Sequence, residues 1–218
     1  MRRILRDQGL TLVMLGLFVV FLGAQSVTGF RVYNAERVQM DEAEISYSRY
    51  LRSGHFIEAT FENWESEFLQ MGAYVLLTAF LIQRGSAESR DPDKDKDADQ
   101  DDEPVTSKSP WMVRHGGLSL KVYENSLPIA LFVIFLFCFV MHAWGGAKVY
   151  SEEQIAEGGH AYSTWSFLHT SQFWFQSFQN WQSEFLAVGS LVVLSIFLRQ
   201  RGSPESKPVA APHNKTGA

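Results

Sequence analysis

FENWESEFLQMGAYVLLTAFLIQRGSAESR (Phe61–Arg90) returns later in the chain as FQNWQSEFLAVGSLVVLSIFLRQRGSPESK (Phe178–Lys207). Aligned without a gap, the two stretches agree at roughly eighteen of thirty positions, which indicates an internal repeat. Each copy begins with Asn-Trp and Ser-Glu-Phe, continues as an apolar run and ends on Gln-Arg-Gly. This pattern is typical of a membrane helix with polar residues at its entry and exit.

Two further apolar runs, Leu10–Gly29 and Leu127–Trp144, are each long enough to cross a hydrocarbon core of about 30 Å. A shift of 117 residues, the same as in the first repeat, places Leu10 on Leu127. The first run therefore corresponds to an internal span, which favours a membrane helix over a cleaved signal peptide. We predict an all-α integral membrane protein with four transmembrane helices.

The repeat and the polar segments define the expected organisation. We predict a first two-helix repeat over residues 1–90, an acidic disordered linker over 91–117, a second repeat over 118–207 and a flexible tail over 208–218. The polar connections at 30–60 and 145–171 are too long for structureless loops, so we expect amphipathic helices at the membrane surface there. Their aromatic residues, including Tyr50, are expected to face the lipid.

The distribution of Lys and Arg predicts the orientation. The N-terminus carries three of these residues, the linker through Lys121 seven and the C-terminal part four, fourteen in all, against five in the two other connections. Because positive residues are enriched on the cytoplasmic side, both termini and the linker are expected inside the cell. The two repeats then have the same orientation, unlike inverted repeats.

Glu67 and Glu184 are the candidate functional residues. They occupy equivalent positions at the heads of the second and fourth apolar runs. Glu67 lies seventeen residues before Arg84, about 25 Å along a helix, which places its carboxylate near the outer membrane boundary. There it could cap the positive end of its helix, or the pair could form an ion or proton site. Both interpretations stay open.

Other candidate residues have structural roles. Tryptophans at the apolar boundaries are expected to anchor the chain at the interface, basic residues are expected at the inner face, and glycines in the apolar runs are expected to permit close helix packing. The anchors are Trp64, Trp174 and Trp181, the inner-face residues are Arg84, Arg199 and Arg201, and the packing glycines are Gly9, Gly16, Gly23, Gly72 and Gly189.

The sequence offers no pattern for a cofactor, a metal, a catalytic residue or nucleic-acid binding. It contains no phosphate-binding glycine loop, no clustered cysteines and no nucleophile elbow. The single cysteine, Cys138, lies in an apolar run and excludes an intramolecular disulfide. The expected partners are the lipid bilayer and either another membrane protein or a second copy of the chain.

The motifs NWESEFL, NWQSEFL and QRGS, together with RVYNAE and YLRSGHFIEATF, resemble a family of small bacterial membrane proteins catalogued as a domain of unknown function. The resemblance covers nearly the whole chain and is weakest in the acidic linker. It implies a four-pass protein of the bacterial inner membrane, and it brings no activity, cofactor or catalytic residue.

Three functions are compatible with these features. The first is a non-enzymatic structural or interaction protein of the bacterial envelope, which we favour. The second is a small transporter or channel that uses Glu67 and Glu184. The third is a membrane enzyme or redox subunit, for which a coloured or metal-containing purified protein would be the sign.

Overall fold

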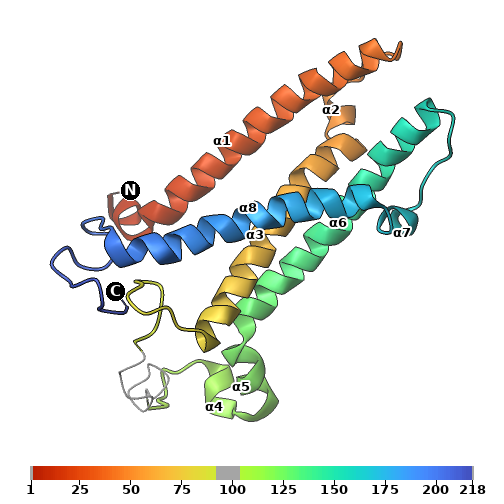
Figure 1. The fold of residues 1–218 in the computed structure, drawn as a ribbon. Helices are drawn as coiled ribbons and strands as arrows, with labels where there is room; N and C mark the ends of the chain where they lie inside the picture. The colour runs from red at the N-terminus through yellow and green to blue at the C-terminus, as the bar shows by residue number, and fades with distance from the viewer. Residues whose placement is uncertain (1, 92–103, 218) are drawn as a thin grey trace. The chain divides into compact units, whose positions relative to one another are not determined.

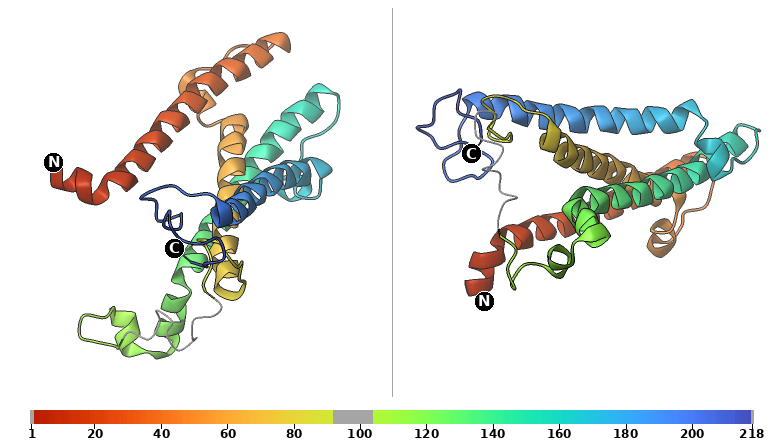
Figure 2. Two further views of the ribbon diagram at one scale, coloured as in Figure 1. Left: turned by 60° about the vertical axis from the view of Figure 1, so that its left-hand side comes forward. Right: turned by 90° about the horizontal axis from the view of Figure 1, so that it is seen from below.

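The computed structural model describes residues 2–91 and 104–217, and this part of the chain is entirely helical, without a strand (Figures 1 and 2). The acidic run predicted as a disordered linker falls mostly outside these residues, from position 92 to 103. The helices are α1 (Arg2–Gln39), α2 (Tyr47–Tyr50), α3 (Gly54–Phe80), α4 (Trp111–His115), α5 (Gly117–Glu124), α6 (Ser126–Ala156), α7 (Thr164–Phe167) and α8 (Ser171–Phe197).

Within the described residues, three helices are long and apolar enough to cross a membrane: α1, α6 and α8. Three of the four expected spans therefore support the prediction of an α-helical membrane protein. The helix α3 has 27 residues but does not reach the same apolarity. Its first half contains four glutamates, whereas the equally long α8 contains only Glu184.

The helices are longer than the apolar runs that predict them. We expected the first run to end at Gly29 and the third at Trp144, but α1 continues to Gln39 and α6 to Ala156. The reason is that no residue stops either helix earlier. After each end the backbone turns into the left-handed region, at Asp41 (φ 58°) and at Gly158 (φ 84°).

The helix α3 begins at Gly54, before the expected end of the first polar connection at position 60, whereas α8 begins at Ser171, where the second connection was expected to end. Ser66 of the repeated motif lies inside α3 and donates its hydroxyl to the carbonyl of Asn63 (2.8 Å). Ser53 and Thr170 precede the two helices instead. Their side-chain oxygens accept hydrogen bonds from the backbone N–H groups of Phe56 and Phe173, each at 3.3 Å.

The chain divides into two compact units. The first unit comprises Met1–Phe61 and Met141–Phe173, and the second comprises Glu62–Val140 and Trp174–Ala218. The unit boundaries fall inside α3, α6 and α8, so each of these helices contributes residues to both units.

An aromatic cluster forms the core of the first unit around Tyr50. This side chain is only 1% exposed, and its ring lies 5.6–5.9 Å from the rings of Phe30, Tyr33, His55 and Phe56. The expectation that Tyr50 faces lipid is therefore wrong. The short α2 turns this ring inward because the helix end of α1 supplies aromatic partners, which the sequence pattern of the connection alone does not reveal.

Glycines permit the aromatic side chains of α2 and α7 to pack directly against the long helices. A Cβ atom on Gly146 would lie 2.6 Å from Cε1 of Phe167, a side chain that is completely buried. A Cβ atom on Gly29 would collide in the same way with the hydroxyl of Tyr50. Both contacts require the absence of a side chain.

We predict that Gly146→Ala and Gly29→Ala each destabilise the protein by about 1–3 kcal/mol, because the added methyl group overpacks a buried ring. Gly16→Ala is the matched control, since a Cβ there meets nothing within 4 Å in the described structure. The buried thiol of Cys138 provides the readout through its reaction with a fluorogenic maleimide during heating. Equal melting temperatures for Gly146→Ala and Gly16→Ala would contradict the prediction.

Candidate functional site

The two candidate glutamates lie against each other in the second unit. Glu67 projects from the middle of α3 and Glu184 from the middle of α8, and their carboxyl groups lie close to each other. Glu67 is exposed on the protein surface and Glu184 is partly buried. Two carboxylates this close repel each other, so a cation between them would be favoured.

Two further carboxylates of α3, which the sequence analysis did not single out, are bound by side chains of α8. The indole N–H of Trp181 donates to Oε1 of Glu65 at 3.1 Å, and Nδ2 of Asn180 donates to Oε1 of Glu62 at 2.5 Å. Glu65 is 0% exposed. Because a buried carboxylate is costly without donors, these bonds hold α3 and α8 in one register.

The three predicted tryptophan anchors lie in different surroundings. Trp181 donates to Glu65, as described above. The ring of Trp174 is 37% exposed and lies 5.4 Å from the ring of Phe178 and 6.4 Å from that of Phe139. Trp64 is partly buried on α3. Trp174 and Trp181 belong to one aromatic group, with their ring centroids 6.3 Å apart.

Of the predicted packing glycines, only Gly72 meets another helix within the described residues. A Cβ atom there would lie 3.4 Å from Cβ of Leu131 and from the ring of Phe132, which is ordinary contact. At the other four positions a Cβ would have nothing within 4 Å. These four are Gly9, Gly16, Gly23 and Gly189. Their role in packing stays a prediction.

Arg199 is engaged where α8 ends. Its Nη1 donates to the carbonyls of Ser195, Ile196 and Leu198, at 3.2, 3.2 and 2.7 Å, and thus caps the last turn of the helix. Arg84 and Arg201, the other predicted inner-face residues, lie exposed in the turns that follow α3 and α8.

A second pair of glutamates meets beyond the C-terminal ends of α3 and α8. Glu88 lies in the loop after α3 close to Glu205, and it accepts a hydrogen bond from the hydroxyl of Tyr74 at 3.3 Å. Burial raises the pKa of Glu88, and the negative charge of Glu205 raises it further. Sequence equivalence could have found this pair, because both residues lie in the repeated QRGS-x-ES motif.

The ammonium group of Lys207 connects the C-terminal tail to the loop after α3. It donates to the carbonyls of Gly85 (2.5 Å), His213 (2.9 Å) and Lys215 (2.9 Å), and the side chain is 1% exposed. Burial lowers the pKa of Lys207, and the nearby charges of Arg199 and Lys215 act in the same direction. The tail is further attached by the bond from Gly217 N–H to the carbonyl of Ser86 (2.9 Å).

No group of three His, Cys, Asp or Glu side chains suited to a metal ion occurs in the described part of the chain. The second unit instead offers paired carboxyl groups, one pair at the middle of α3 and α8, where we had expected it at their heads, and one pair beyond their C-terminal ends.

The Glu88–Glu205 pair predicts a pH dependence of stability. A carboxyl whose pKa is raised in the folded protein stabilises the fold below its ordinary pKa, and this stabilisation is lost as pH rises through the raised value. We therefore expect thermal stability to fall between about pH 4.3 and neutral pH. Glu88→Gln should remove part of this dependence and stabilise the protein at pH 7 by about 0.2–1 kcal/mol, because it removes one charge of a partly exposed like-charged pair.

The measurement is the melting temperature of the two proteins from pH 4 to pH 8. Glu124→Gln, which changes an exposed glutamate at the end of α5, is the matched control and should keep the native profile. A native-like pH profile for Glu88→Gln would show that the pair does not titrate as described.

A comparison with known protein families identifies a relationship that extends over all 218 residues. A family model described as a domain of unknown function, DUF6766, matches residues 1–218. No curated protein and no solved structure matches the chain. The expected resemblance to a family of unknown function is thereby confirmed, and the chain belongs to the DUF6766 family.

Proposed function

We propose that this protein is a four-span, non-enzymatic structural or interaction protein of the bacterial inner membrane. In this proposal α1, α3, α6 and α8 cross the bilayer as two tandem repeats of the same orientation, with both termini in the cytoplasm. The observation that carries the architecture is the direct contact between equivalent glutamates, Glu67 with Glu184 and Glu88 with Glu205.

Equivalent residues of two related halves approach each other only near the axis that relates the halves. Here two such contacts occur, 21 residues apart in each copy. If the two copies ran in opposite directions, they could meet at equivalent residues only once, where they cross. Two contacts in the same order therefore support copies that run side by side in parallel, as in repeats related by an axis along the membrane normal.

The element boundaries support the same organisation. A shift of 117 residues carries the bounds of α2 onto those of α7, the bounds of α3 onto those of α8, and the end of α1 onto the end of α6. Asp41 and Gly158, the residues with left-handed backbone that follow α1 and α6, are related by the same shift.

Local hydrogen bonds that follow the first helix of each half are also related by this shift. Asn34 bonds both backbone groups of Ile45, at 2.9 and 3.1 Å. Ser151 bonds both backbone groups of Tyr162, at 2.8 and 3.1 Å. The two halves thus use different side chains for the same task, which is what a diverged duplication predicts.

The charged residues of α3 are compatible with α3 as the fourth span. Its glutamates Glu62 and Glu65 bond to donors on α8, so their polar groups are satisfied within the protein. Polar groups at membrane depth are tolerated where protein surrounds them. Under this proposal α3 enters the bilayer as a partner of α8 and not as an independent apolar helix.

Cysteine cross-linking tests the parallel repeats. In a Cys138→Ser background, Glu67→Cys and Glu184→Cys are expected to form an intramolecular disulfide on mild oxidation, because the two native side chains are in contact. A protease site inserted at the acidic linker then separates the halves, which stay linked only through the disulfide. Glu67→Cys with Gln182→Cys is the control, since Gln182 lies two positions before Glu184 and therefore on another face of α8. Similar yields for both pairs would refute the arrangement.

A second function, ion or proton transport, is favoured by the close approach of Glu67 and Glu184. Two neighbouring carboxyl groups can bind a cation or pass on a proton. In this alternative the pair serves the two repeats jointly.

Flux through proteoliposomes separates the two functions. For the structural role we expect no proton or cation flux above that of empty liposomes, because the positions that follow Glu184 on the same side of α8 include the apolar Ala187 and Leu191. Transport would instead give a flux that Glu67→Gln and Glu184→Gln reduce by about tenfold or more, while the exposed control Glu124→Gln leaves it unchanged. That result would replace our first proposal with the second.

A further inference from the structure

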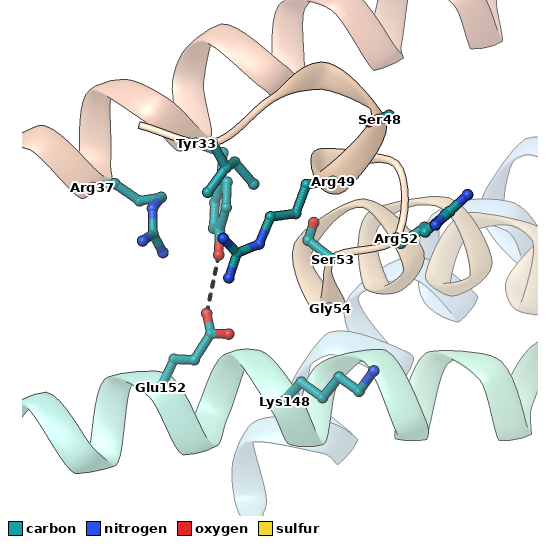
Figure 3. A pocket seen from close by; sticks show the side chains of 10 residues that line it. Tyr33, Arg37, Ser48, Arg49, Arg52, Ser53, Gly54, Lys148 and Glu152 are labelled. Atoms are coloured by element: carbon teal, nitrogen blue, oxygen red, sulfur yellow. Dashed lines mark hydrogen bonds between the residues drawn. The ribbon is translucent and has the colours of Figure 1, made fainter. Parts of the chain in front are cut away.

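A cavity of about 350 Å³ lies in the first unit, between the end of α1, the segment around α2 and the C-terminal part of α6 (Figure 3). Its charged lining residues are four cations and one anion, namely Arg37, Arg49, Arg52, Lys148 and Glu152. The formal charge of the lining is therefore positive.

The basic residues are concentrated here against the general trend of the chain. The two connections at 30–60 and 145–171 belong to the side that is poor in Lys and Arg, and they contain only five such residues. Four of the five line this one cavity, and the exception is Arg31. Membrane topology does not require positive charge on this side, so the gathering needs another explanation.

Two of the four cations already have partners. Arg37 forms an ion pair with Glu42 at 2.8 Å and donates to the carbonyl of Ala43 at 2.9 Å. The ammonium nitrogen of Lys148 lies 3.4 Å from the ring centroid of Trp144, a cation–π contact. These contacts fix the two side chains at opposite ends of the cavity.

The other two cations, Arg49 and Arg52, form no ion pair with any carboxylate of the described residues. The carboxylate of Glu152 accepts a hydrogen bond from the hydroxyl of Tyr33 at 3.2 Å instead. Figure 3 shows the guanidinium of Arg49 reaching toward this Tyr33–Glu152 bond, while Arg52 extends away from it. The cavity thus has guanidinium donors whose charge is not compensated by the protein.

We propose that this cavity binds a phosphate group, with Arg49 as the principal ligand and Arg52 as a second lining cation. Guanidinium groups present planar pairs of N–H donors that match the oxygens of phosphate, and the hydroxyls of Ser48 and Ser53 line the same space. The cavity volume lies at the lower end of ligand pockets, which measure about 300–1,000 Å³. It has room for a phosphate with a small organic group attached.

The phosphate has two chemical sources, a soluble phosphate ester or the headgroup of an anionic phospholipid. Both present the same group to Arg49 and Arg52, and both are tested with the full-length protein. The proposal does not depend on the number of spans, because all lining residues belong to the first unit.

The first experiment is calorimetric titration of the protein in maltoside micelles, which contain no phosphate, with glycerol 3-phosphate. The double variant Arg49→Gln/Arg52→Gln should bind it about tenfold more weakly or worse, because two charge-assisted interactions are lost. Arg31→Gln is the matched control, since it removes a basic residue of the same side that does not line the cavity. It should bind as the native protein does.

The second experiment measures the melting temperature in nanodiscs of phosphatidylcholine alone and of phosphatidylcholine with phosphatidylglycerol. A ligand that binds the folded state raises the melting temperature. For a lipid source, phosphatidylglycerol should stabilise the native protein and Arg31→Gln, but not Arg49→Gln/Arg52→Gln. Helical circular dichroism and the variant Arg49→Lys/Arg52→Lys, which retains both charges, separate a loss of binding from a loss of folding.

The two experiments together identify the source of the phosphate as well as its binding site. Binding in micelles identifies a soluble phosphate ester, and a response that occurs only with phosphatidylglycerol identifies a lipid headgroup. The proposal is overturned if neither probe binds, or if the double variant responds to both as strongly as Arg31→Gln does.

Discussion

The hydrogen bond from the indole of Trp181 to the carboxylate of Glu65 allows that carboxylate to be buried on α3. A carboxylate removed from water costs several kcal/mol unless donors replace the lost hydration. Trp181 supplies one such donor, and Asn180 supplies another to Glu62. The helix α3 therefore depends on α8, and the rest of the second unit is arranged around this contact.

The two copies of the repeated stretch have diverged in a complementary way. Where α3 has Glu62 and Glu65, the corresponding residues of α8 are the neutral Gln179 and Gln182. If both copies had kept carboxylates at these positions, the facing helices would repel each other. Of the acidic residues in the first repeated stretch, only Glu67 and Glu88 have acidic counterparts in the second copy, and each lies close to its counterpart.

The sequence was sufficient for the helical class and for the equivalence of Glu67 and Glu184, because apolar length and an ungapped repeat are local signals. It did not predict that these two residues touch, since contact depends on the faces that α3 and α8 turn toward each other. Helix ends were misplaced because apolarity ends at the membrane boundary, whereas a helix ends where the backbone is forced to turn, as at Asp41. The basic cavity was missed for a related reason. Its cations come from separate segments, and no spacing connects Arg49 with Lys148.

The position of Lys207 has a consequence for biosynthesis. Its ammonium bonds the carbonyl of Gly85, a residue 122 positions earlier in the chain, together with carbonyls that follow it closely. A growing polypeptide cannot make this bond until Lys207 has been synthesised. The carbonyl of Gly85 therefore stays without this partner while the intervening residues are translated. Closure of the loop after α3 by Lys207 can then follow only once the second repeated stretch is complete.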